Sequence, residues 1–303
     1  MQLELPAWQQ RLSLLICFWA TFVGTGCETN ELGVVGVRFT TVMEGIEYAH
    51  YRQEGSISGK DFRGNVFRLD LRKVDMRVLP AGGPGTRREV EEIVRAIPLV
   101  IAVNGSFFDE DGKAMGIVVD QGRLISRYRK KSWGALVISD SKASLMKGSE
   151  VNLGTNPDIV LQGQPRLVVN GKMSKLKRQV AKRVALCLEA EGRDTHHQNR
   201  LVIVTASEVD AQDFASFLAL PRGRGGLGCL DALNLDGGPS AQLLARLRDV
   251  RVQTPGGDAV PNALVAIPAR EKSANEPTGS PQAQGKVQKQ SIEPAKKVKS
   301  EDS

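Results

Sequence analysis

Histidine is scarce in this chain of 303 residues, which contains only three. Two of them, His196 and His197, are adjacent in the polar segment 191–200, where we expect a hairpin loop at the surface. Adjacent side chains on a loop do not readily face one site, so little material remains for histidine-based acid–base catalysis or for a zinc site. The sequence therefore gives little support to either kind of chemistry.

Cysteine is also rare, and the four cysteines show no metal-type spacing with histidine. Cys17 lies in the N-terminal apolar run, whereas Cys187 and Cys229 each lie in an apolar run further on, as small buried hydrophobic residues often do. Two buried thiols and a disulfide formed in an oxidising compartment are both open at this point, because the sequence does not give the distance between them.

The N-terminal apolar run, Leu12–Val23, is too short to span a bilayer comfortably, but it has the length of a signal-peptide core and follows Arg11. It ends in Gly24-Thr25-Gly26-Cys27, which is similar to a bacterial lipoprotein signal, although Gly24 stands where leucine is usual. We predict an exported protein of the bacterial cell envelope, attached to a membrane through a lipid on Cys27. Simple secretion and a retained anchor are the alternatives.

Aromatic residues make up only 5% of the chain, and the formal net charge is +7. A basic balance suits nucleic acid, anionic surfaces or phosphate-bearing substrates, and predicted export makes nucleic acid the least suitable of these. From residue 270 the composition changes to charged and small polar residues of both signs, which predicts a disordered tail. We expect a signal peptide over 1–27, a tether over 28–36, one folded domain over 37–269 and the tail over 270–303.

The folded part reads as strand-rich. Residues 65–72 alternate between polar and apolar side chains, which predicts a half-buried strand, and the apolar run 99–103 predicts a buried one. Hairpins are expected within 116–125 and 135–146, and a turn at Asn170-Gly171. Thr86 and Glu89 have the spacing of a capping box and predict a short helix to about residue 96, and Ser207 with Asp210 predicts another to residue 220.

The stretch Asn234-Leu235-Asp236-Gly237-Gly238-Pro239-Ser240 is the most informative part of the chain. The apolar residues before it predict a buried strand that ends at the carboxylate of Asp236. The two glycines permit a tight turn, and Pro239 suits the first turn of a helix, which we expect to continue to Leu244. A helix N-terminus attracts anions, so this turn is a candidate site. The plainer alternative is a strand-to-helix turn in which Asp236 only caps the helix.

A second polar cluster, Asn104-Gly105-Ser106-Phe107-Phe108-Asp109, follows the buried strand 99–103. Together with the stretch at Asp236 and three further motifs, in order along the chain, it resembles the phosphodiester glycosidase family. The further motifs are Glu44-Gly45-Ile46-Glu47-Tyr48, Gln164-Pro165-Arg166-Leu167-Val168-Val169-Asn170-Gly171 and Arg183-Val184-Ala185. The resemblance implies an α+β domain with strongly bent, mostly antiparallel sheets and flanking helices. It also implies hydrolysis of a sugar-1-phosphodiester, such as an ester of N-acetylglucosamine-1-phosphate, to a free sugar and a phosphomonoester.

For this reaction we expect a small set of residues to form the site. A phosphodiester leaves as a weakly basic anion, so the site needs donors for phosphate and an acidic group near the sugar C1, and depends less on a general acid. We assign catalytic roles to Asp236, Arg183 and Asn104, and substrate contacts to Gly237, Gly238, Ser240, Asp109 and Phe108. No ligand set demands a metal, and a divalent cation at Asp236 remains open.

Two departures from the family pattern leave other functions open. In the arginine motif, Val184 stands where the family usually has a hydroxyl residue, and Cys187 stands where it has glycine. In the turn after Asp236, Pro239 replaces a frequent glycine. The departure in the arginine motif removes a hydrogen-bond donor beside the expected site. The alternatives are a non-catalytic lipoprotein that binds an anionic envelope polymer, and a metal-dependent phosphodiesterase that cleaves the P–O bond.

Overall fold

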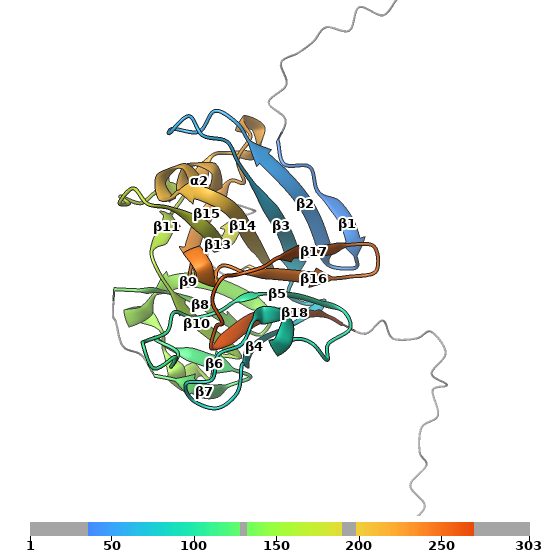
Figure 1. Cartoon of the computed structure of the whole chain (residues 1–303), viewed down its shortest axis with the longest axis vertical. Coiled ribbons are helices and arrows are strands. Elements are labelled where there is room, and N and C mark those ends of the chain that lie inside the picture. Colours follow the sequence, from blue (N-terminus) through green and yellow to red (C-terminus); the bar gives the residue numbers. More distant parts are fainter. Residues whose placement is uncertain (1–35, 128–131, 190–197, 270–303) are drawn as a thin grey trace, which may run out of the picture.

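The computed structural model describes residues 36–127, 132–189 and 198–269, and shows three sheets in which every described strand pair is antiparallel (Figure 1). The β13 sheet has the order β1-β2-β3-β14-β13-β15-β11-β12, the β10 sheet β7-β6-β10-β8-β9, and the β5 sheet β17-β16-β5-β18-β4. The prediction of mostly antiparallel sheets is confirmed. The α+β assignment and the strong bending stay predictions.

The strands follow one another with few helical interruptions. Their bounds are β1 Thr40–Met43, β2 Ile46–Gln53, β3 Phe62–Asp70, β4 Val74–Pro80, β5 Val100–Asn104, β6 Val118–Asp120, β7 Arg123–Ser126, β8 Gly134–Ser139, β9 Lys142–Lys147, β10 Ile159–Gly163, β11 Arg166–Val169, β12 Lys172–Met173, β13 Val180–Glu189, β14 Arg200–Asp210, β15 Cys229–Asn234, β16 Leu243–Arg246, β17 Arg251–Thr254 and β18 Asn262–Pro268. The helices are α1 Val90–Ile93 and α2 Ala211–Ala219, and short 3-10 turns lie at Gly148–Glu150, Leu153–Thr155, Arg222–Arg224 and Gly238–Ser240.

The main hydrophobic core lies where the inner faces of the three sheets meet. Leu186 and Leu233 reach it from the β13 sheet, Leu136 from the β10 sheet, and Ile101 and Leu264 from the β5 sheet. A second core fills the space between the other face of the β13 sheet and α2. Because alternate residues of a strand point to opposite faces, β13 and β15 contribute to both cores, and their backbones are held firmly in place.

Several local predictions are confirmed. The two expected hairpins appear as β6–β7 and β8–β9, and the turn at Asn170-Gly171 joins β11 to β12. Cys187 and Cys229 form a disulfide, which resolves the alternative left open by the sequence. The lipid site Cys27, the predicted signal peptide, the charged tail, and His196 and His197 lie outside the described residues.

The helix predictions need correction. Behind Asp236 the chain makes only the 3-10 turn Gly238–Ser240 and then enters β16, because Leu243–Arg246 pair with β5 on one side and β17 on the other. The expected capping box at Thr86 yields only α1, which has no side-chain cap. For α2 the N-cap is Asp210, whose carboxylate accepts from the N–H of Gln212. No helix within the described ranges is long and apolar enough to cross a membrane.

Candidate active site

One end of the β5 sheet gathers the two polar stretches that the sequence singled out. β5 ends at Asn104, β16 begins just after the turn at Asp236, and β18 begins at Asn262, so three connections cross this end of the sheet. The term sheet edge denotes this end, where the three strands begin or stop. The stretches around Asn104 and Asp236 are separated by 132 residues along the chain. The antiparallel ladder therefore brings together what the sequence keeps apart.

Asn104 joins the two stretches directly. Its side chain is fully buried; the Nδ2 group donates to the main-chain oxygen of Asp236 (2.8 Å), and Oδ1 accepts from the N–H of Gln242 (3.0 Å). One amide thus holds both ends of the Asp236 turn. Because these two bonds engage a donor and an acceptor of the amide, Asn104 acts here as a positioning residue.

The turn itself depends on one glycine conformation. Gly238 has φ of +60°, which favours glycine, and no atom lies within 4 Å of a Cβ placed there. Gly237 is extended, and its N–H donates to Oδ1 of Asp236 (3.0 Å). Ser240 is buried and its side chain hydrogen-bonds to the same carboxylate. Two of the residues expected to contact substrate, Gly237 and Ser240, therefore support Asp236.

The carboxylate of Asp236 has an altered acidity. Burial raises the pKa of Asp236 above its ordinary value, and the nearby charge of Asp258 acts in the same direction. Hydrogen bonds from Ser240 and from the Gly237 N–H favour the ionised form and oppose this rise. A carboxylate that is half-buried, held by two hydrogen bonds and raised in pKa is the kind of group that active sites hold.

Asp258 is a site residue that sequence reasoning missed. Its N–H donates to the main-chain oxygen of Pro239 (3.1 Å), as does the N–H of Gly257 (2.7 Å), so the loop before β18 is fastened to the Asp236 turn. The buried Gln242 completes the arrangement by donating from Nε2 to the Asp258 main-chain oxygen (2.8 Å). No sequence signal identifies Asp258, because it is one acidic residue in a loop whose position depends on distant contacts.

Arg183 is adjacent to Asp236 through the backbone. Ala185 pairs with Asn234, and the Leu235 N–H donates to the Val184 oxygen (2.9 Å), so the chain leaving β15 passes alongside Arg183. A Cβ on Gly237 would lie 3.0 Å from the main-chain oxygen of Lys182. The two residues are therefore neighbours along the backbone, and the expected catalytic role of Arg183 stays a prediction.

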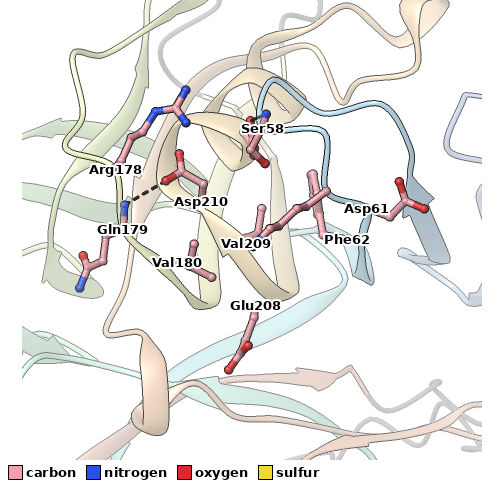
Figure 2. Close-up of a pocket in the computed structure, with 11 residues that line it drawn as sticks. Ser58, Asp61, Phe62, Arg178, Gln179, Val180, Glu208, Val209 and Asp210 are labelled. Carbon is pink, nitrogen blue, oxygen red and sulfur yellow. Dashed lines mark hydrogen bonds between the residues drawn. The ribbon is translucent and has the colours of Figure 1, made fainter.

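The guanidinium of Arg183 has its own contacts. It is 5% exposed and donates from Nη2 to the main-chain oxygen of Gln179, and its buried Nε has no partner among the described residues. Burial lowers the pKa of Arg183, and the nearby carboxylate of Asp210 acts in the opposite direction. Figure 2 shows the hollow on this side, where Asp210 accepts from the Gln179 N–H and Arg178 lies beside it; its volume is about 410 Å³.

The remaining predicted contacts lie on the loop after β5. Asp109 accepts from the Lys113 N–H (2.8 Å) and so closes the turn 109–113. Phe108 is partly buried against the small core around α1, and the guanidinium of Arg87 lies 5.2 Å from its ring centroid. Both residues shape this loop. No group of three or more His, Cys, Asp or Glu side chains within the described ranges is arranged to hold a metal ion.

Two hollows adjoin this sheet edge. One, of about 570 Å³, is lined by His50, Arg63, Asn65, Lys182 and Thr254, and lies next to the turn through Lys182. The other, of about 670 Å³, lies between β4 and β7 and reaches Pro261 and Asn262. Both cavities have basic groups in their lining, and Asp236 itself lines neither of them.

Comparisons with known proteins bear on the family and the fold of the chain. The family model for phosphodiester glycosidases matches residues 98–267, more than half of the chain. A search of curated proteins finds no match. Among solved structures, the chain is similar to the catalytic domain of zebrafish N-acetylglucosamine-1-phosphodiester alpha-N-acetylglucosaminidase, auto-inhibited by its pro-peptide. The TM-score is 0.59 and the identity 16%, over 78% of this chain and 87% of that one. A hypothetical protein from Synechocystis gives a TM-score of 0.51 and 16% identity over 76% of this chain and 64% of that one. At these identities the structural likeness shows the fold alone.

Proposed function

The chain belongs to the phosphodiester glycosidase family, and on that premise we propose that it hydrolyses the bond between sugar and phosphate in a sugar-1-phosphodiester. The products are a free sugar and a phosphomonoester. The observation that carries the proposal is Asp236, whose carboxylate is raised in pKa and held by Ser240 and the Gly237 N–H, and whose main chain is held at the sheet edge by Asn104. A reaction that builds positive charge at the sugar C1 requires a fixed negative group of this kind.

The bond changes place different demands on the two sides of the site. The C1–O bond breaks and the phosphate takes its electron pair, while water supplies the new oxygen at C1 and loses a proton. Asp236 stabilises the positive charge at C1 and, with its raised pKa, can accept that proton. Because the departing phosphomonoester is a weak base, no strong general acid is required on its side.

A basic group on β13 suits the phosphate. Lys182 lines the hollow next to the turn, and its Nζ is 3.4 Å from the main-chain oxygen of Pro255. Arg183, the cation expected from the sequence to hold the phosphate, does not line this hollow, and its guanidinium is engaged with the main-chain oxygen of Gln179. In this scheme Asn104 holds the turn and does not contact the sugar.

A panel assay tests the proposal. The full-length protein is incubated with methyl, glycosyl and alkyl esters of N-acetylglucosamine-1-phosphate and of other sugar-1-phosphates, and the released reducing sugar is measured. We expect turnover of at least one ester and loss of activity in Asp236→Ala. Carrying out the reaction in heavy-oxygen water should place the label in the sugar. Label in the phosphate would instead identify P–O cleavage, and absence of turnover throughout the panel contradicts an enzymatic role.

Export and anchoring are part of the same proposal. The short apolar run before Cys27 supports a lipoprotein of the bacterial envelope, where the substrate is a phosphodiester-linked glycan. Cells that express the protein should incorporate a labelled fatty acid into it, and Cys27→Ser should abolish the label while the membrane fraction loses the protein. Retention of the label in that variant contradicts anchoring through this cysteine.

A binding protein is the second candidate, and one observation favours it. The position of Cys187, where the family has glycine, is occupied by half of a disulfide, and the Arg183 guanidinium already has a main-chain partner. A protein of this kind binds anionic envelope polymer without releasing product. Saturable binding that is unchanged in Asp236→Ala, together with no turnover, would favour this function; lack of binding at physiological salt would exclude it.

A further inference from the structure

The groove between β4 and β7 has apolar side chains in its lining as well as polar ones. It encloses about 670 Å³, and its middle is lined by Leu79, Leu124 and Ile125. Leu124 is 41% exposed and Ile125 37%, and they are the one pair of consecutive residues among the large exposed hydrophobic side chains of the described ranges. An exposed apolar pair inside a cavity marks a binding surface more often than a single exposed leucine does.

The charges around the groove have a definite order. At its outer end, Arg77 and Asp120 neutralise each other through a close ion pair (2.7 Å), and Asp120 also accepts from the Val78 N–H. Arg123 and Arg127, at the two ends of β7, have no acidic partner in the described part of the chain. The groove therefore combines an apolar part, at Leu79, Leu124 and Ile125, with a neutralised ion pair and two basic residues that have no acidic partner in the described part of the chain.

The inner end of the groove, at Asn262, is linked to the Asp236 turn through the segment from Asn104 to Ser106. Asn262, which lines that end, accepts from the Ser106 N–H (2.9 Å) and donates to the Ser106 hydroxyl (2.8 Å). Ser106 is two residues beyond Asn104, whose side chain holds the Asp236 main-chain oxygen. A substrate whose sugar lies at Asp236 can thus extend its other part past Asn262 into the groove.

We propose that this groove binds the alcohol part of the phosphodiester substrate, and that this alcohol is an apolar chain. The inference rests on the proposed function and names the substrate class for the same site. The apolar side chains of Leu124 and Ile125 cover the chain, and Arg127, which follows β7 and lines the same groove, adds positive charge for the phosphate. A purely polar alcohol would leave the apolar pair exposed to water.

Binding of alkyl phosphates tests the inference without turnover. Calorimetric titration of the full-length protein with methyl phosphate and with octyl phosphate, below its micelle concentration, should show octyl phosphate bound about tenfold more tightly or better. The double variant Leu124→Asn/Ile125→Asn should lose this difference. Both residues are exposed, so we expect the variant to fold, which its circular dichroism and melting curve check. Ile57→Asn is the matched control, because Ile57 is an exposed apolar residue on a distant loop.

The outcomes separate this inference from the proposed function. Equal binding of methyl and octyl phosphate overturns it, as does a preference for octyl phosphate that the double variant retains. Salt-sensitive binding of a poly(glycerol phosphate) that exceeds the binding of octyl phosphate also overturns it and assigns the groove to an anionic polymer. If no ester of the panel is hydrolysed while octyl phosphate remains preferred and the double variant loses that preference, the proposed function fails and the groove remains a site for an apolar phosphate ester.

Discussion

Replacing Asn104 by alanine should separate the placement of Asp236 from the stability of the fold. The side chain is fully buried, and its loss leaves the Asp236 main-chain oxygen and the Gln242 N–H without their partner. Each buried group left unsatisfied costs about 1–3 kcal/mol, so we expect the free energy of unfolding to fall by about 2–5 kcal/mol. Urea denaturation followed by circular dichroism measures this loss.

Activity should fall further than stability explains. If Asn104 only supported the fold, the variant would regain normal kcat under conditions in which it is fully folded. Because the amide holds the main chain of Asp236, we expect kcat to fall about a hundredfold while KM changes little, since a misplaced group mainly affects the transition state. The assay uses the best substrate of the ester panel at a temperature well below the melting transition.

Gln198→Ala is the matched control for this variant. Gln198 is also a buried amide that donates to a main-chain oxygen, that of Glu189, but it lies beyond the opposite end of β13 from Arg183. We expect a comparable loss of stability with kcat within about threefold of the unmodified protein. If Asn104→Ala and Gln198→Ala lose activity equally after correction for folding, the positioning argument is refuted.

Three further predictions concern the same sheet edge. Since burial raises the pKa of Asp236, the unmodified protein should lose stability as pH rises from the ordinary value of about 3.9 through the folded-state pKa. Asp236→Asn should remove that loss. Urea titrations from pH 3.5 to 7 measure the free energy of unfolding of both proteins, and the same pH dependence in both would contradict the prediction. Asp258→Asn removes a like charge and should shift the acidic limb of kcat/KM to lower pH; an unchanged limb would show that Asp258 does not influence Asp236. Gly105→Ala places a Cβ 1.9 Å from Oδ1 of Asn262 and should destabilise the fold by about 2–4 kcal/mol in the same urea assay. Gly238→Ala has open space around its Cβ and should cost only about 1 kcal/mol, because of the positive φ at this position.

The strands were predictable because their signals are local. Alternation identified β3, the apolar run identified β5, and the Asn170-Gly171 turn identified the hairpin after β11. The expected helix after Pro239 failed for a reason outside the local sequence. Gln242 gives its N–H to Asn104, and the residues that follow pair with β5 and β17, so strand pairing overrides the helix-starting preference of proline.

The site was predictable only in part. The sequence singled out Asp236, Asn104 and Arg183 as candidates, and the ladder from β13 to β15 brings the backbone of Arg183 next to the chain that leads to Asp236. The sequence did not reveal which contacts the side chains of these residues make. The side chain of Asn104 is directed at a main-chain oxygen, and the acidic neighbour Asp258 comes from a loop held by hydrogen bonds to Pro239. Such contacts depend on side-chain directions that no local pattern encodes.

The distribution of buried amides singles out this edge of the β5 sheet as the place of the candidate site. Asn104, Gln242 and Asn262 are each at most 4% exposed, and each hydrogen-bonds to main-chain groups of a connection that crosses the edge. Burying an amide costs free energy unless its groups are satisfied, and apolar side chains would pack a simple sheet end as well. Three amides at one edge therefore imply that the loops carrying Asp236 and Ser106 must hold a fixed position that apolar packing alone does not specify. The same amides connect the Asp236 turn to the inner end of the groove, so a change in one of them should alter both the chemistry at the sugar and the choice of alcohol.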